Sequence, residues 1–189
     1  CLFISLWGGS IRFNTPMLFA LAFLPMFGIG GLTGLPLGFN FSDVALHDSY
    51  YVIAHFHYVV APGTIFAIFA GVYYWFPKMT GRRMNEFWGR VHFWGSLIFM
   101  NLIFMPMFAQ DMAGMSRRMS DGGATYSLAN PDNADITAGA LGDTIMGLNV
   151  SISAAAWAML VAQLPFIVNL FWSVKHGEKV KSDNPWQAT

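Results

Sequence analysis

Four long stretches of the chain are almost entirely apolar, and shorter polar segments separate them. The stretches run over about 17–37, 50–76, 87–108 and 145–172 of the 189 residues. A helix needs about 20 mostly apolar residues to cross the hydrocarbon core of a bilayer, and each stretch reaches that length. The pattern therefore predicts an all-α fold, a polytopic transmembrane helix bundle with four spans that form a single region over residues 1–189.

Proline and glycine positions predict where the spans begin and bend. Asn14 and Thr15 are candidate N-terminal caps of the first span. Pro25 and the glycines at 28, 30, 31 and 34 should bend that span. Pro62 lies inside the second span and should kink it, because proline cannot donate a helical hydrogen bond.

Composition supports a membrane protein over the alternative, the buried helical core of a soluble protein. The chain is 55% apolar and 11% charged, whereas a soluble chain carries about 25% charged residues. The formal net charge is zero, which gives no reason to expect a nucleic-acid partner. The chain starts at Cys1 without a signal-peptide pattern, so we expect it to be part of a longer polypeptide.

The distribution of basic residues predicts the orientation of the spans. Bases gather before the first span, between the second and third, and after the fourth: Arg12, Lys78, Arg82, Arg83, Arg90, Lys175, Lys179 and Lys181. The other two connections carry seven aspartates and only Arg117 and Arg118 as bases. Because basic loops stay on the cytoplasmic side, both ends of the region should lie on that side, or on the matrix side of a mitochondrion.

His55 and His57 are two residues apart within the second span. A helix turns about 100° per residue, so the two rings should point to opposite faces and cannot grip one ion together. Ionisable residues at membrane depth are functional candidates, and haem iron takes an axial histidine. The spacing predicts two separate metal centres; the alternative is that each ring only bonds a backbone carbonyl. His92 and His176 are interpreted as polar-interface residues.

Arg117 and Arg118 are the only bases in the acidic connections. Arginine pairs with carboxylates in bidentate geometry, so the two side chains could hold the propionates of two haems. The alternative is a solvated pair that Asp111 and Asp121 neutralise.

Asp43, His47 and Asp48 lie just before the second span. Carboxylate and imidazole suit a divalent cation, but one chain supplies too few ligands here, so a partner would complete the site. The alternative is a helix-capping cluster in which Asp48 offsets the helix dipole.

The run His47-Asp48-Ser49-Tyr50-Tyr51-Val52-Ile53-Ala54-His55-Phe56-His57-Tyr58-Val59 resembles the signature of haem–copper oxidases, specifically subunit I of cytochrome c oxidase. Three further stretches are similar to that family: 30–34 (Gly-Gly-Leu-Thr-Gly), 75–77 (Trp-Phe-Pro) and 114–118 (Gly-Met-Ser-Arg-Arg). The likeness covers nearly the whole chain and implies the last four of twelve helices, the C-terminal third of the subunit. Ser116 and Met119 depart from the pattern, and the connection after them is long.

The resemblance implies a role for each site residue. His55 would be the axial ligand of a high-spin haem that binds oxygen, and His57 one of two ligands of a low-spin haem, with haem A the expected type. Arg117 and Arg118 would hold propionates, with Asp43 nearby. A further pair, His47 and Asp48, would ligate magnesium or manganese shared with subunit II. The copper ligands would lie in earlier helices.

The implied activity is the reduction of oxygen to water by cytochrome c, coupled to proton translocation, with this chain inactive alone. The implied partners are the N-terminal part of subunit I, subunits II and III, cytochrome c and membrane lipid. The implied location is a bacterial plasma membrane or a mitochondrial inner membrane. One alternative is a quinol oxidase of the same superfamily, which Asp48 and Tyr58 disfavour; another is a non-catalytic membrane assembly or transport protein.

Overall fold

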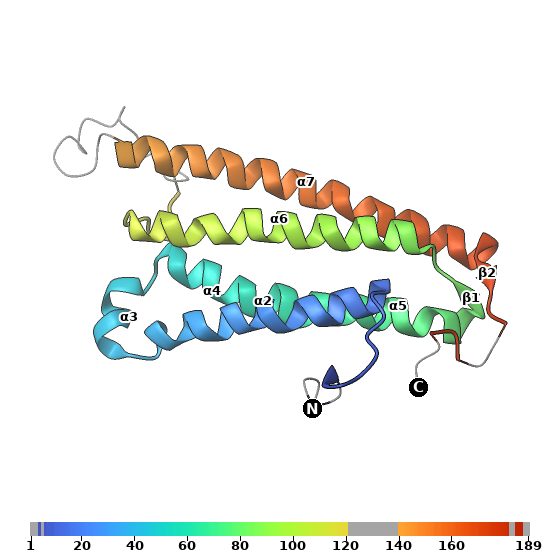
Figure 1. The fold of residues 1–189 in the computed structure, drawn as a ribbon. Helices are drawn as coiled ribbons and strands as arrows, with labels where there is room; N and C mark the ends of the chain where they lie inside the picture. Colours follow the sequence, from blue (N-terminus) through green and yellow to red (C-terminus); the bar gives the residue numbers. More distant parts are fainter. Residues whose placement is uncertain (1–3, 5, 121–139, 182–183, 187–189) are drawn as a thin grey trace.

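A computed structural model describes residues 4, 6–120, 140–181 and 184–186, with the side chains of 140–146 left out. The elements are α2 (Thr15–Leu37), α3 (Asn40–Leu46), α4 (Tyr50–Val60), η1 (Ala61–Phe66), α5 (Ala67–Thr80), β1 (Arg82–Arg83), α6 (Glu86–Met112), α7 (Ala140–His176) and β2 (Glu178–Lys179). The long helices lie side by side, with α7 along α6 and α2 along the α4–η1–α5 rod (Figure 1).

Four segments in the described part of the chain are long and apolar enough to cross a membrane. They are Thr15–Leu37, Tyr50–Thr80, Glu86–Met112 and Gly147–His176. The all-α polytopic bundle with four spans is therefore confirmed, and the predicted bounds differ by only a few residues. Their outer faces leave large apolar side chains exposed, Leu32, Leu102 and Leu164 among them, which suits contact with lipid or other protein.

The second span is one continuous rod of three segments. The α-helix α4 passes into the π-helical turn η1 at Ala61, and α5 continues to Thr80. Pro62 is the second residue of η1. Because proline cannot donate a helical hydrogen bond, the wider π-turn is how this rod accommodates it, at the position where the sequence predicts a kink.

Side-chain caps fix where three of the helices begin. The Asn14 side chain accepts a hydrogen bond from the Met17 amide at 3.2 Å, so the cap of α2 is Asn14, one of the two candidates. Asn85 caps α6 in the same way. The cap of α4 is Ser49, whose hydroxyl accepts from the Tyr51 amide. Each cap satisfies a backbone N–H that the helix leaves without an internal partner.

Phe19 of α2 is the centre of the core, and it is fully buried. Its ring meets Phe93 edge-on at 5.0 Å and Phe66 edge-on at 5.4 Å, the arrangement that aromatic quadrupoles favour. Elsewhere α6 and α7 approach closely at a pair of small residues. A Cβ atom built at Gly95 would lie only 2.7 Å from Cβ of Ala162, so this helix contact requires glycine.

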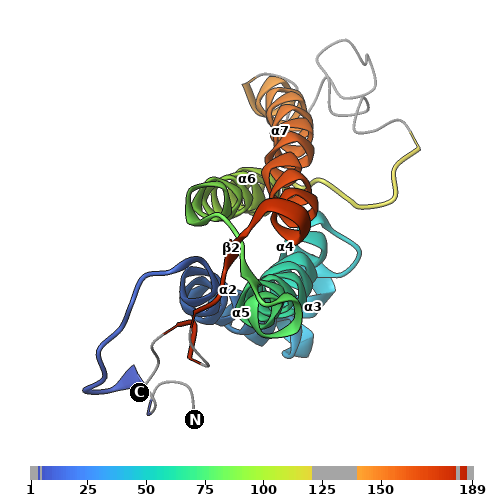
Figure 2. The ribbon, with the colours of Figure 1, turned by 90° about the vertical axis from the view of Figure 1, so that its right-hand side faces the viewer.

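The two ends of the bundle are organised differently, as Figures 1 and 2 show. At one end, called here the α3 end, the short helix α3 precedes the start of α4; this helix was not predicted. At the other, the β end, β1 pairs antiparallel with β2. There the Asn169 side chain bonds both the N–H and the carbonyl of Asn85, at 2.9 and 2.8 Å. These bonds tie the end of α7 to the start of α6.

Candidate functional site

His55 lies on α4 with its ring against α2. Its Nδ1 is 2.9 Å from the carbonyl oxygen of Gly30 and 3.2 Å from Oγ1 of Thr33. A carbonyl oxygen can only accept a hydrogen bond, so Nδ1 carries the proton and Nε2 carries the lone pair. Within the described part of the chain, Nε2 has no hydrogen-bond partner. The ring is therefore oriented as metal-binding histidines are, with one nitrogen bonded to the protein and the other available.

Two glycines of α2, one turn apart, make room for this arrangement. A Cβ atom at Gly34 would lie 2.8 Å from Cε1 of His55, so any larger residue would push against the ring. A Cβ atom at Gly30 would lie 2.9 Å from the backbone of Tyr58 and would force α2 away from α4. The same close approach brings the Gly30 carbonyl within reach of the imidazole.

His57 is held in a different way and against a different helix. Its Nδ1 is 2.8 Å from the carbonyl oxygen of Ile53, one turn earlier on α4. Its ring stacks on Phe104 of α6, with centroids 4.4 Å apart and planes 13° apart. The carbonyl again fixes the proton on Nδ1, and the described residues again offer Nε2 no hydrogen bond. This ring is also half-buried.

The two rings thus diverge as the helical spacing predicts, His55 toward α2 and His57 toward α6. Both also form the backbone bonds that the alternative interpretation expects, but those bonds occupy one nitrogen of each ring only. Within the residues that the structure describes, no group of three or more His, Cys, Asp or Glu side chains could hold a metal ion. Each imidazole would therefore need further ligands from outside this set.

A second cluster lies at the α3 end, where the segment after α6 meets the start of α4. The Tyr50 amide donates to the carbonyl of Met115, and the Arg117 amide donates to the carbonyl of Asp48. The Arg117 side chain then donates to Oδ1 of Asp48 from Nε at 2.7 Å, and its Nη2 lies 2.7 Å from the same oxygen. Arg117 and Asp48 are 69 residues apart in sequence, so these contacts join two distant segments.

The Arg117–Asp48 pair revises two alternatives that the sequence leaves open. Arg117 is neutralised by Asp48 and not by Asp111, while Asp121 lies outside the described residues. Ser49, and not Asp48, is the N-terminal cap of α4. Asp48, the residue before it, has a left-handed backbone conformation with φ 55°. The hydrogen bond from Arg117 is the largest cause that holds the pKa of Asp48 below its ordinary value.

The other predicted residues of this cluster lie around the pair. Nε2 of His47 is 3.5 Å from Oδ2 of Asp48, and Nδ1 of His47 is 4.0 Å from Oδ2 of Asp43. Arg118 is exposed and has a left-handed backbone, φ 63°. The structure therefore brings Asp43, His47, Asp48 and Arg117 together and directs Arg118 to the surface.

The interpretation as polar-interface residues fits His176 but not His92, which lies in the core of the bundle. His92 is fully buried, and both of its ring nitrogens are bonded, to the Tyr73 hydroxyl at 3.1 Å and to Oε1 of Gln163 at 3.0 Å. His176 is exposed at the end of α7 and stacks on Trp172.

Sequence reasoning missed the groups that orient the two candidate ligands. The glycines at 30 and 34 were interpreted only as places where the first span bends. Their spacing of four puts them on one helix face, which is the pattern that lets two membrane helices approach closely. No sequence pattern could have identified Thr33 and Phe104. Their contacts with His55 and His57 depend on which helices pack against α4.

Comparison with known proteins places these features in a family. Residues 1–148 match the family model described as cytochrome c and quinol oxidase polypeptide I. Cytochrome c oxidase subunit 1 of Synechocystis sp. is 44% identical over 184 residues, 97% of this chain. The same protein of Thermostichus vulcanus is 40% identical over 96% of the chain, and a probable cytochrome c oxidase subunit 1-beta of Nocardia farcinica is 39% identical over 97%.

This chain spans 30%, 29% and 28% of the lengths of those three relatives, so it corresponds to a fragment of them. The family match covers well over half of the chain and includes both histidines of α4. The chain belongs to the cytochrome c and quinol oxidase polypeptide I family, the haem–copper oxidases.

Proposed function

We propose that this chain forms the last four helices of the catalytic subunit of a cytochrome c oxidase. In the intact complex that enzyme would reduce oxygen to water with electrons from cytochrome c and couple the reaction to proton translocation. The observation that carries the proposal is the pair of diverging imidazoles on α4, each with Nδ1 bonded to a carbonyl and Nε2 available. The four apolar spans and the family make the chain part of an integral membrane protein.

The residues present fit a haem on each side of α4. His55 would hold the high-spin haem, and His57 would help to hold the low-spin haem. When bound, the two groups would supply one-electron redox chemistry and, on the His55 side, an oxygen-binding iron. Gly34 leaves the space that the His55 ring occupies, and Phe104 stacks on the His57 ring. The carbonyl bonds of both rings fix the tautomer and raise the basicity of Nε2.

The cluster at the α3 end supports a second part of the proposal. Oδ1 of Asp48 is engaged by Arg117, which leaves Oδ2 beside His47 as a donor for magnesium or manganese. Two ligands do not close such a site, so subunit II would supply the rest. Arg117 and Arg118 would hold haem propionates, with Asp43 nearby. Arg118, being exposed, has the greater freedom to do so, whereas the Arg117 side chain is 19% exposed.

The remaining components of the enzyme would come from outside this chain. Earlier helices of the subunit would supply the copper ligands and the second ligand of the low-spin haem. Subunits II and III would be its partners in the complex, and the chain alone would be inactive. The basic loops at the β end favour an N-terminus on the cytoplasmic or matrix side.

Spectroscopy of the intact complex tests the proposal. Reduction should produce two haem absorptions, of which carbon monoxide should shift only one. A spectrum unchanged by reductant would contradict the proposal. The family description also covers quinol oxidases. Oxygen consumption supported by a quinol but not by reduced cytochrome c would assign the chain to that branch.

A further inference from the structure

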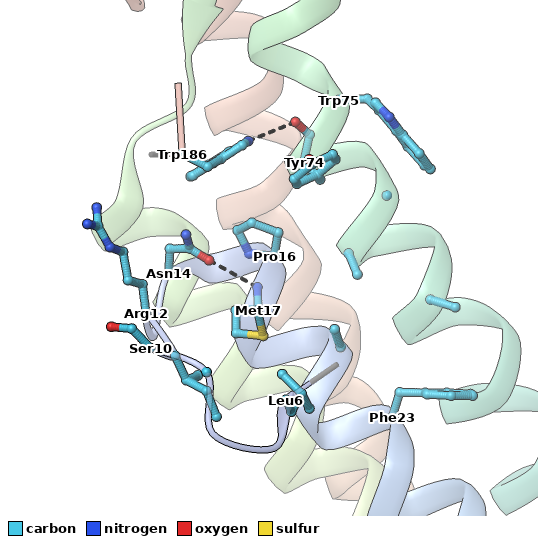
Figure 3. Close-up of a pocket in the computed structure, with 16 residues that line it drawn as sticks. Leu6, Ser10, Arg12, Asn14, Pro16, Met17, Phe23, Tyr74, Trp75 and Trp186 are labelled. Carbon is cyan, nitrogen blue, oxygen red and sulfur yellow. Dashed lines mark hydrogen bonds between the residues drawn. The ribbon is translucent and has the colours of Figure 1, made fainter. Parts of the chain in front are cut away.

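A cavity of about 620 Å³ lies beside the start of α2, at the β end of the bundle, and neither His55 nor His57 lines it (Figure 3). Three parts of the chain enclose it: the segment before α2, the adjoining faces of α2 and α5, and Trp186 near the C-terminus. Trp186 is buried and its indole N–H donates to the Tyr74 carbonyl at 2.9 Å, so Trp186 forms a fixed part of the wall.

The lining of the cavity changes from polar to apolar along its length. Arg12, Asn14 and Trp186 lie toward one end, and Leu6 and Phe23 toward the other (Figure 3). Small apolar residues of the two helices, Ala20 and Ala70 among them, form the wall between. A molecule with a polar head and an apolar tail matches this gradient.

Depth in the membrane fits the same kind of ligand. α2 begins at Thr15, so its lining residues from Pro16 to Phe23 cover about the first 12 Å of the span at 1.5 Å per residue. The cavity therefore starts at the membrane surface and enters the hydrocarbon layer. Trp75 is exposed and Tyr74 adjoins it at this level, where amphipathic aromatic rings concentrate.

Charge indicates which head group the cavity would accept. None of the described residues that line it is acidic, and Arg12 is among them. Two further cations contact aromatic lining residues: the Lys78 ammonium lies 4.5 Å from the centroid of the Tyr74 ring, and the Arg83 guanidinium lies 5.3 Å from that of the Trp186 ring. Every lysine and arginine of the chain except Arg117 and Arg118 falls in the segments at this end. Such a concentration of bases attracts anionic lipid head groups.

We infer that this cavity binds an anionic phospholipid. The phosphate lies at the end lined by Arg12 and Asn14, and part of one acyl chain lies between α2 and α5 along Ala20 and Ala70. A volume of about 620 Å³ is in the range of small-molecule sites, so it holds the head group and upper chain while the remainder extends into the bilayer. The site is separate from the proposed haem centres, so it can be tested by measuring bound lipid without measuring oxidase activity.

Retention of phospholipid by the intact oxidase complex tests the site. The complex is washed with detergent, then titrated with phosphatidylglycerol or phosphatidylcholine, and bound lipid is counted by native mass spectrometry. Arg12→Gln should weaken phosphatidylglycerol binding about fivefold or more, the effect of one cation near a membrane surface. Ala20→Phe fills the apolar wall and should weaken binding without any change of charge.

Two matched variants separate the cavity from the general surface. Lys175→Gln removes an exposed cation at the same end, and Ala154→Phe enlarges an exposed alanine of α7; both should bind as the parent does. Equal losses in Arg12→Gln and Lys175→Gln would overturn the site in favour of diffuse attraction. Equal affinity for the two lipids would also overturn it, as would cross-linking of an Ala20→Cys variant to another polypeptide segment instead of lipid.

Discussion

His92 on α6 and the two histidines of α4 all lie within membrane-spanning helices, but their ring nitrogens are used differently. His92 is fully buried, and since Oε1 of Gln163 can only accept, Nε2 carries its proton and Nδ1 accepts from Tyr73. Both nitrogens are thereby satisfied inside the protein. His55 and His57 are half-buried and carry the proton on Nδ1, which leaves each Nε2 with a lone pair and no bond from the described residues.

This difference separates a structural histidine from a candidate ligand without reference to any bound group. In the hydrocarbon layer a polar atom costs free energy unless it is hydrogen-bonded or coordinated, so an imidazole at membrane depth with one unused nitrogen is a candidate ligand. Burial alone would single out His92, the most buried of the three, although both of its ring nitrogens are bonded inside the protein. The state of the second nitrogen is the better criterion.

The largest expected effect on stability comes from removing the His92 ring, whose two nitrogens are both hydrogen-bonded. His92→Ala should lower the free energy of unfolding by about 2–4 kcal/mol, because the Tyr73 hydroxyl and the Gln163 amide oxygen would both lose a buried partner. Thermal unfolding of the intact complex measures this, with His176→Ala as the exposed control. The haem spectrum of His92→Ala should be that of the parent. If His92→Ala instead lost the haem spectrum at unchanged stability, His92 could not be distinguished from His55 and His57 in this way.

A smaller effect is expected from crowding the His55 ring. Gly34→Ala should weaken retention of the high-spin haem, recorded as its carbon monoxide-binding signal, by about 10–100-fold, the usual cost in metal affinity of disturbing the groups that orient a metal ligand. Gly31→Ala is the matched control on the same helix, because a Cβ atom there meets nothing within 4 Å. Alanine favours a helix over glycine by about 1 kcal/mol, so helix propensity cannot explain a loss. Normal binding in Gly34→Ala would show that the ring tolerates displacement.

The smallest expected effect concerns the second hydrogen bond of His55. Thr33→Val keeps the side-chain shape but removes the oxygen 3.2 Å from Nδ1. The ring would become a weaker electron donor, so the potential of the high-spin haem should rise by about 20–60 mV, the equivalent of one hydrogen bond. A redox titration measures the shift, and Thr33→Ser should behave as the parent does. An unchanged potential in Thr33→Val would mean that the hydrogen bond to the Gly30 carbonyl alone determines the electron donation of the His55 ring.

Helical geometry and hydrophobic length were enough to predict the four spans and that the two rings would meet different neighbours, α2 for His55 and α6 for His57. Both depend on distances along one helix, which the sequence contains. The Arg117–Asp48 pair could not be predicted, because the two residues meet only when the segment after α6 returns to the start of α4. The short helix α3 was missed for a related reason: its seven residues are stabilised by their neighbours more than by their own pattern.

The central claim is that His55 and His57 serve two separate centres on opposite sides of one helix. It is tested most directly by replacing each histidine with alanine in the intact complex and recording reduced and carbon monoxide difference spectra. His57→Ala should remove the low-spin haem absorption while carbon monoxide still binds. His55→Ala should abolish carbon monoxide binding while the low-spin absorption remains. Equal loss of both signals in each variant would contradict two separate centres.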